Sequence, residues 1–319
     1  MSFGDGTNAA VDPTNPVTAY LALPEASIKK TTDDSVTLND ITGPDGPTPN
    51  PSLTDKGRLP FVTTMTLDQS NTNRLLVGTY RLWETTDGGA TWRPTGTQDL
   101  TGGSGTVSAI AIAPTMTSTV YVGTDTGLIQ ASMDDGATFT SGGGLPGRYV
   151  AAIAVSPSTP TTAWAGISGF NAATPGKSGH VFQTTNGGQT WSAVSGAPGN
   201  SGLPDVPVND VAAGADGRVY VATDTGVFVS SNATSANATW TPLGTGLPNT
   251  PTFALNLRRD GLLFASTHGC GLMVAANASA LEWSHDHHRL RQRMRLHHHR
   301  GCAGSRLGRY HHLHQPRYI

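Results

Sequence analysis

One eight-residue phrase recurs along this chain, and its spacing limits the fold more than any other feature of the sequence. The phrase reads TTDGGATW at 85–92, SMDDGATF at 132–139 and TTNGGQTW at 184–191. Altered copies stand at 31–38 (TTDDSVTL) and 230–240 (SSNATSANATW). Repetition with a period of roughly 20 to 50 residues is typical of solenoids and propellers, in which each unit packs against the next. The chain is therefore expected to be an array of similar units.

Each unit carries three short runs of alternating character before the phrase and one after it. Examples are VSAIAI (107–112), TVYVGT (119–124) and LIQAS (128–132). A period of two indicates β-strands rather than helices. Taking the centre of each first strand places six units at Val11, Leu67, Ile112, Val155, Ala213 and Leu257. Four strands in about 45 residues is the size of one propeller blade.

The sequence predicts an all-β fold, a β-propeller of four-stranded antiparallel blades. Six repeats are visible, so we expect a six-bladed ring or an incomplete seven-bladed one. Either ring is expected to be a fragment of a longer secreted protein. The sixth unit shows no fourth strand and no phrase after STHGCGL (266–272). Composition agrees, since 39 Gly, 21 Pro and only 13% charged residues suit many short strands joined by tight turns.

The last 39 residues differ from everything before them, and we predict two regions. Residues 1–280 form the propeller and carry 12 Lys and Arg against 20 Asp and Glu, a net charge of −8. Residues 281–319 are a His- and Arg-rich tail with a net charge of +6 and nine of the eleven histidines. We interpret the tail as disordered, and translation in the wrong reading frame is one explanation for its composition. The alternatives are a metal site formed by its histidines and a basic arm that binds nucleic acid non-specifically.

Several classes of protein are not expected. No run of about 18 apolar residues is present, so no membrane span is predicted. Residues 1–20 lack the basic start and apolar run of a signal peptide. The two cysteines fit no zinc spacing, and the sequence predicts neither a metal site nor a cofactor.

The recurring phrase has the chemistry of a tight turn. Its hydroxyl and its acid or amide can bond the backbone locally, and its glycine tolerates a positive φ. Its aromatic residue can pack between neighbouring blades. We predict structural roles for Thr85, Asp87, Gly89, Trp92, Ser132, Asp134, Gly136, Phe139, Thr184, Asn186, Gly188 and Trp191.

The phrase resembles the Asp-box, or bacterial neuraminidase repeat (BNR), S-x-D-x-G-x-T-W, of the sialidase-like superfamily. In that superfamily the boxes lie on outer hairpins of β-propellers and are not catalytic. Longer stretches, including GDGTNAAVDPTNPVTAY (4–20) and NRLLVGTYRLWETTDGGATW (73–92), look like secreted bacterial relatives of xyloglucan-active glycoside hydrolases. The resemblance covers residues 3–276 and departs at Cys270, where that group usually carries arginine. It implies an extracellular or periplasmic location.

Strand direction sorts the connections of each blade onto two faces. Linkers between blades share one face with the loops from second to third strand, whereas the recurring phrases lie on the other. The long insertions at 43–60, 168–180 and 196–207 all fall on the first face, and long loops on a rigid scaffold usually carry function. Candidate ligand contacts are Asp45, Asp55, Lys56, Arg58, Tyr80, Arg81, Asp125, Phe170, Asn171, Lys177, His180, Asp205, Asp224 and His268. Asp125 and Asp224 also suit local turn hydrogen bonds.

Three functions remain open at this point. The favoured one is binding of a polysaccharide or other ligand on the loop face, within a fragment of a larger glycoside hydrolase. The second is hydrolysis of a β-glucan or xyloglucan-type polysaccharide by a pair of carboxylates, for which Asp5 is the single catalytic candidate. The third is protein binding, since sortilin-type receptors and photosystem-assembly propellers use the same repeat in that way. Sialidase activity is not expected, because residues 1–280 hold only two glutamates.

Overall fold

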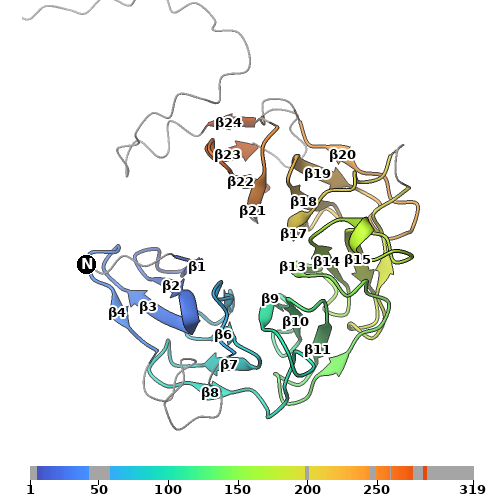
Figure 1. The fold of residues 1–319 in the computed structure, drawn as a ribbon. Helices are drawn as coiled ribbons and strands as arrows, with labels where there is room; N and C mark the ends of the chain where they lie inside the picture. Colours follow the sequence, from blue (N-terminus) through green and yellow to red (C-terminus); the bar gives the residue numbers. More distant parts are fainter. Residues whose placement is uncertain are drawn as a thin grey trace, which may run out of the picture.

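The protein is a propeller of six four-stranded antiparallel sheets. The structure, a computed structural model, describes residues 6–42, 58–197, 201–244, 247, 249–258, 260–275 and 283–285. Figure 1 shows the six blades around a common centre, with an open arc between β1 of the first blade and β21 of the last. The all-β propeller predicted from the repeats is confirmed, with six blades.

Every blade uses its four strands in sequence order from the centre outward. The first strands are β1 (Asn8–Val11), β5 (Met65–Leu67), β9 (Val107–Ile112), β13 (Val150–Val155), β17 (Val208–Ala213) and β21 (Thr252–Leu257). The second strands are β2 (Ala19–Leu23), β6 (Leu75–Gly78), β10 (Val120–Thr124), β14 (Ala163–Ile167), β18 (Val219–Thr223) and β22 (Leu263–Thr267).

The outer strands are shorter. The third strands are β3 (Ser27–Thr31), β7 (Leu82–Thr85), β11 (Ile129–Ser132), β15 (Val181–Thr184), β19 (Gly226–Ser230) and β23 (Gly271–Ala275). The fourth strands are β4 (Asn39–Asp40), β8 (Arg93–Pro94), β12 (Thr140–Ser141), β16 (Ser192–Ala193), β20 (Thr241–Pro242) and β24 (Trp283–His285). Two 3-10 turns, η1 (Pro24–Ala26) and η2 (Asn171–Ala173), complete the elements of the described residues.

Two details of the sequence interpretation need correction. The six residues taken as centres of the first strands are in fact their last residues, so the spacing was right but the position was late. Four of these strands, β9, β13, β17 and β21, also shift register against their partner strand near the start.

The second correction concerns the sixth blade, which does have a fourth strand. Trp283 pairs with Ala275 and His285 with Met273 in antiparallel register. The boundary predicted at residue 280 therefore falls before β24. A short edge strand is held by backbone hydrogen bonds, and it needs no alternating sequence pattern that could be recognised in advance.

Burial along the second strands shows which blades have two neighbours. β6, β10, β14 and β18 are buried at every position, whereas burial alternates along β2 and nearly so along β22. A sheet that is covered on both faces is buried continuously, and one that is covered on a single face alternates. Blades 2 to 5 are therefore enclosed between neighbours, while blades 1 and 6 flank the open arc in Figure 1.

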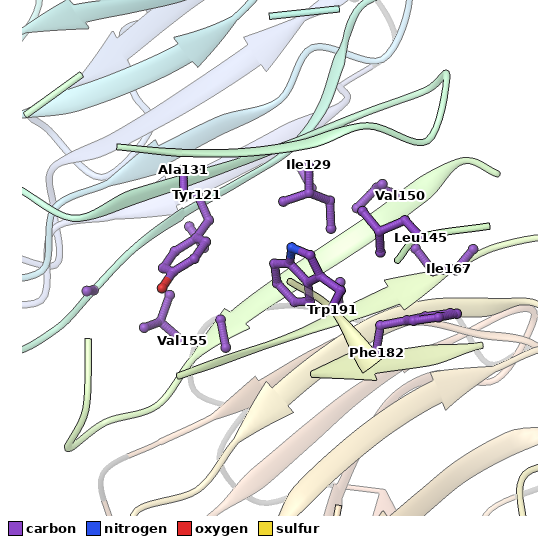
Figure 2. Close-up of a cluster of buried hydrophobic side chains, with 14 residues drawn as sticks. Tyr121, Ile129, Ala131, Leu145, Val150, Val155, Ile167, Phe182 and Trp191 are labelled. Atoms are coloured by element: carbon purple, nitrogen blue, oxygen red, sulfur yellow. The ribbon is translucent and has the colours of Figure 1, made fainter. Parts of the chain in front are cut away.

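The aromatic residue of each recurring phrase lies between its own blade and the preceding one. Trp191 is 3% exposed and packs with Tyr121 and Ile129 of the third blade, as Figure 2 shows. Trp92 and Phe139 occupy the corresponding clusters two blades and one blade earlier, respectively. The Trp92 indole also donates a hydrogen bond to the carbonyl oxygen of Ile41 in the first blade (2.8 Å). Burial of such large rings is a major part of what holds successive blades together.

The recurring phrases form the turns from third to fourth strand, and one hydrogen-bond pattern closes them. Thr85 Oγ1 donates to Asp87 Oδ1 (2.8 Å) and accepts from the N–H of Gly89 (2.9 Å). Asp87 accepts from the N–H and the hydroxyl of Thr91 (2.9 and 2.6 Å), and these bonds lower its pKa to about 2. The second phrase makes the same set of bonds through Ser132, Asp134, Gly136 and Thr138. In the third phrase Thr184 donates to Asn186 and accepts from the N–H of Gly188, while Asn186 accepts from the N–H of Thr190 and donates through Nδ2 to the Thr190 hydroxyl.

Candidate functional site

One face of the propeller carries the linkers between blades together with the loops from second to third strand; we call it the loop face. Hydrogen bonds tie these two kinds of connection to each other. The N–H of Asp125, after β10, donates to the carbonyl oxygen of Thr106, just before β9 (3.0 Å). The N–H of Ser168, after β14, donates to the carbonyl oxygen of Tyr149, just before β13 (2.9 Å). The recurring phrases lie on the opposite face, which we call the turn face.

The exposed aromatic rings of the described residues all lie on the loop face. Phe61 is 69% exposed and Tyr149 41%, both in linkers, and Phe170 is 52% exposed in the loop of the fourth blade. Phe253 is 54% exposed at the start of β21, with its ring against His268 of the neighbouring loop (6.0 Å between centroids). Exposed apolar side chains on the turn face are aliphatic, namely Val11, Val36, Leu38, Met116 and Met133. The two faces therefore differ in the kind of apolar surface they present.

A first cluster on the loop face gathers Arg58, Tyr80 and Arg81. The guanidinium groups of Arg58 and Arg81 each lie 4.7 Å from the centre of the Tyr80 ring. Arg58 also forms an ion pair with Asp99 (2.5 Å) and donates to the carbonyl oxygen of Gly105 (3.2 Å). This ion pair lowers the pKa of Asp99 to about 2. The cluster joins the first two linkers, and Asp99 was not among the sequence candidates.

A second cluster gathers Asn171, His180 and Asp205. His180 Nε2 lies 2.9 Å from Asp205 Oδ1, and the same oxygen accepts from the N–H of Asn171 (2.9 Å). The His180 ring is 2% exposed, whereas about half of the Asp205 side chain is exposed. Burial lowers the pKa of His180, and the hydrogen bond from the backbone of Asn171 is the main cause of the lowered pKa of Asp205. The ring is thus neutral and the carboxyl ionised near pH 7.

Arg148 belongs to this second cluster and was missed by the sequence interpretation. Its side chain is 7% exposed and donates through Nη2 to the carbonyl oxygen of Gly179, while its Nε and Nη1 have no partner among the described residues. Burial lowers its pKa, and the charge of Asp205 opposes that shift. Its neighbour Tyr149 is the exposed ring described above, and burial raises the pKa of that phenol. Nothing in the local sequence GGLPGRYV marks either residue.

The remaining candidates are dispersed over the loop face. Asp125 accepts from the N–H and hydroxyl of Thr106 (2.9 and 3.0 Å), and Asp224 accepts from the amide of Asn209 (2.9 Å). Lys177 and His268 are exposed. The other candidates, Asp5, Asp45, Asp55 and Lys56, lie outside the described residues.

Asp210 on β17 is a further acidic group that the sequence interpretation passed over. Burial raises its pKa to about 6. Its Oδ2 accepts from the N–H of Leu255 on β21 and its Oδ1 from the N–H of Val211, both at 2.7 Å. Oδ2 thus fixes the fifth blade against the sixth, while Oδ1 bonds the next residue of the same strand.

Neither a metal-binding cluster nor a membrane-spanning helix is found among the described residues. No group of three or more His, Cys, Asp and Glu side chains there is arranged to hold a metal ion. No helix among those residues has the length and apolarity needed to cross a membrane.

Comparison with known proteins places the fold. Neither a family model nor a curated protein matches the sequence. The structure is similar to an ancestral GH74 enzyme, with a TM-score of 0.60 and 17% identity over 85% of this chain and 36% of the enzyme, so this chain spans about a third of that protein. YCF48 from Cyanidioschyzon merolae matches with a TM-score of 0.58 and 10% identity, over 89% of this chain and 85% of that one. The structure of YCF48 bound to D1 peptide matches with a TM-score of 0.54 and 15% identity, over 90% of this chain and 87% of that one. At such identities the likeness shows the propeller fold alone.

Proposed function

We propose that the loop face binds a polysaccharide. The observation that carries this proposal is the placement of Phe61, Tyr149, Phe170 and Phe253, the exposed aromatic rings of the described residues, on this single face. The apolar faces of sugar rings stack on exposed aromatic side chains, and a few polar groups beside them then fix orientation. The loop face supplies those polar groups in its two clusters. Secretion to the cell exterior or periplasm, where polysaccharides are met, is part of the proposal.

The pKa values and hydrogen bonds of the described carboxylates support ligand binding more than they support hydrolysis. A glycosidase of the retaining or inverting type needs one carboxylic acid that stays protonated to donate to the leaving group. Asp99 and Asp205 on the loop face instead have lowered pKa values, each because of hydrogen bonds to its carboxylate. Asp210 has the raised pKa, but both its oxygens accept backbone N–H groups. Asp5 stays a candidate for catalysis through the family resemblance only.

Affinity electrophoresis in native gels containing xyloglucan, mannan or glycol chitin tests the proposal. The protein should be retarded by at least one of these polymers, and Tyr149→Ala and Phe170→Ala should each reduce the retardation. Met116→Ala is the matched control, because Met116 is 50% exposed but lies on the turn face, and it should migrate as the parent does. Migration unaffected by every polymer would overturn the proposal. If a polymer is cleaved, Asp5→Ala should abolish product release.

A peptide is the second candidate ligand. Phe61 and its neighbour Val62 are 69% and 55% exposed, and such an adjacent apolar pair suits an apolar peptide side chain as well as a sugar. Binding to an array of random twelve-residue peptides distinguishes the two. Enrichment of apolar sequences that is lost in Phe61→Ser, without any retardation by polysaccharides, would favour the peptide.

A further inference from the structure

The sheet face of the sixth blade that borders the open arc of Figure 1 lacks the cover that the same face has in the other blades. In blades 1 to 5, one large side chain in the middle of the second strand packs against the next blade and is almost completely buried. These side chains are Tyr20, Leu76, Tyr121, Trp164 and Tyr220. The same position of the sixth blade holds Phe264, which is only partly buried. Its neighbours along β22, Leu263 and Ala265, pack against the fifth blade, so Phe264 faces the arc.

A second apolar position on this face of the sixth blade shows the same difference. Leu272 on β23 pairs with Ser266, two residues from Phe264 on β22, so the two apolar side chains lie on one face. Leu272 is 36% exposed, whereas its counterparts in the other blades are at most 2% exposed. Those counterparts are Ile28, Leu82, Ile129, Val181 and Val227. The sixth blade therefore carries the apolar surface that a following blade covers elsewhere, and this surface is open to solvent.

The first blade borders the arc with the opposite kind of face, the one that a preceding blade covers. Leu21 on β2 is partly exposed, although the residues at its position in the other blades are completely buried. They are Val77, Val122, Ala165, Val221 and Ala265. Leu38 is 50% exposed and stands at the place of the aromatic residue in the altered phrase of this blade. The rings at that place in the next four blades are buried against the preceding blade, namely Trp92, Phe139, Trp191 and Trp240.

One four-stranded sheet matches both sides of the arc. It would cover Phe264 and Leu272 as a following blade does, and Leu21 and Leu38 as a preceding blade does. The longest stretch of chain outside the described residues, 286–319, is shorter than the roughly 45 residues of one blade and is rich in Arg and His. A second copy of the chain offers only end blades with a single open face each, so it can cover one side of the arc but not both.

We propose that the open arc is the docking site for one four-stranded β-sheet of a partner polypeptide. This sheet is apolar on both faces and carries an aromatic ring that packs on Phe264 and Leu272, as Trp191 packs on Tyr121 and Ile129. Apolar sheet faces that a monomer leaves open are typical of such interaction sites. The inference goes beyond the proposed function, because it concerns the gap between β1 and β21 and not the rings of the loop face.

A tethered copy of the chain's own third blade is the probe for this site. The fusion carries a second copy of residues 107–149 ahead of Met1 of the full chain, and the tether gives the added blade a high effective concentration at the arc. Hydroxyl-radical footprinting read by mass spectrometry measures the exposure of single side chains. Oxidation of Phe264, Leu272 and Leu21 should fall several-fold in the fusion relative to the parent protein, while oxidation of Phe170 on the loop face should not change.

The matched control is the same fusion with Phe139→Ser in the added copy alone, which removes the ring expected to pack on Phe264. It should return the oxidation of Phe264 and Leu272 to near the level of the parent. Oxidation that the unaltered fusion leaves unchanged, or equal protection by the control fusion, overturns the inference. Should the fusion fail to fold by far-UV circular dichroism, a synthetic peptide of residues 107–149 is added in excess to the parent instead, and absence of protection by that peptide overturns the inference.

Protection of Phe264 and Leu272 in the parent protein alone would also overturn the inference. Light scattering then identifies what covers them. A monomer would mean that the first and sixth blades close the ring on each other, and a dimer would mean that a second copy occupies the arc.

Discussion

Tyr121 of the third blade and Trp191 of the fourth meet edge to face, with ring centroids 6.3 Å apart and ring planes at 80°. Figure 2 shows both rings inside the cluster that joins these two blades. Tyr121 also donates to the carbonyl oxygen of Pro160 (2.8 Å), and burial raises its pKa to about 12. This contact between residues 70 positions apart is one of the places where the repeat becomes a single folded unit.

Removing the indole at this contact should be strongly destabilising. Trp191→Ala should lower the free energy of unfolding by about 3 to 5 kcal/mol, the range for truncation of a large buried aromatic residue. Trp191→Phe should cost much less, because Phe139 occupies the same position of the preceding phrase. Urea denaturation followed by far-UV circular dichroism measures both. A loss below about 1 kcal/mol for the alanine variant would contradict the role assigned to this ring.

The acid of the recurring phrase should be replaceable by an amide but not by an apolar residue. Asp87→Ala removes the acceptor for both groups of Thr91 and should cost about 1 to 2 kcal/mol of stability. Asp87→Asn should be nearly neutral, because at this position of the third phrase Asn186 accepts from the N–H of Thr190 (3.1 Å) and donates to the Thr190 hydroxyl (2.9 Å). Thermal unfolding of the two variants side by side checks this, and equal losses would argue against local hydrogen bonding as the reason for the acid.

Arg74 should matter far more than Arg93, although both form an ion pair with Glu84. Arg74 is buried and also pairs with Asp68 of its own blade (3.1 Å) and with Asp135 of the next blade (2.5 Å). The side chain of Arg93, in contrast, is 68% exposed. Arg74→Met leaves buried carboxylates without compensation and should cost about 3 to 5 kcal/mol. Arg93→Met should cost less than about 1 kcal/mol. Chemical denaturation distinguishes them, and a reversed order would contradict this assignment.

Two glycines with a similar backbone offer a matched test of the loop-face packing. Gly127 and Gly147 have φ values of +88° and +74°. A Cβ on Gly127 would lie 2.4 Å from the backbone carbon of Gly147 and 2.5 Å from the nitrogen of Arg148, while a Cβ on Gly147 would meet open space. Gly147→Ala should cost only the strain of the left-handed conformation, about 1 to 2 kcal/mol, and Gly127→Ala clearly more. Equal losses in chemical denaturation would mean that these loops adjust freely.

Asp210 should give the stability an acid-dependent component. Its pKa is raised to about 6 in the folded protein from an ordinary value of 3.8, so between these values the folded state binds a proton that the unfolded chain has released. Its contribution is therefore fully present below pH 3.8 and is lost as the pH rises through 6. The unfolding free energy of the parent protein should therefore fall relative to that of Asp210→Asn as the pH rises from 4 to 7. A difference independent of pH would contradict the raised pKa.

The sequence allowed much of the fold to be predicted because the decisive interactions are local. In each phrase the hydroxyl, the acid and the glycine bond groups two to four residues away, as Thr85 does with Asp87 and Gly89. Such bonds repeat wherever the phrase repeats, so period, strand order and face assignment follow from the chain itself. The fourth strand of the sixth blade escaped prediction because it depends on pairing with β23 and not on a side-chain pattern.

The candidate site was predictable only in outline. Of the residues proposed from the long insertions, the structure brings Asn171, His180 and Asp205 together. Arg148 could not be identified, because the carbonyl that it contacts belongs to Gly179, 31 residues later and in another loop.

By itself the sequence determined a repeating blade, its turn chemistry and the face on which the loops gather, since all three depend on neighbours along the chain. The tertiary structure decided which candidate side chains meet. It brought the carboxylate of Asp205 to His180, and it placed the charge of Arg148 where that charge adds to the effect of burial in lowering the pKa of His180. It also left the rings of Tyr149 and Phe170 exposed. These outcomes depend on how one blade packs against the next, which brings together groups that are far apart in the chain.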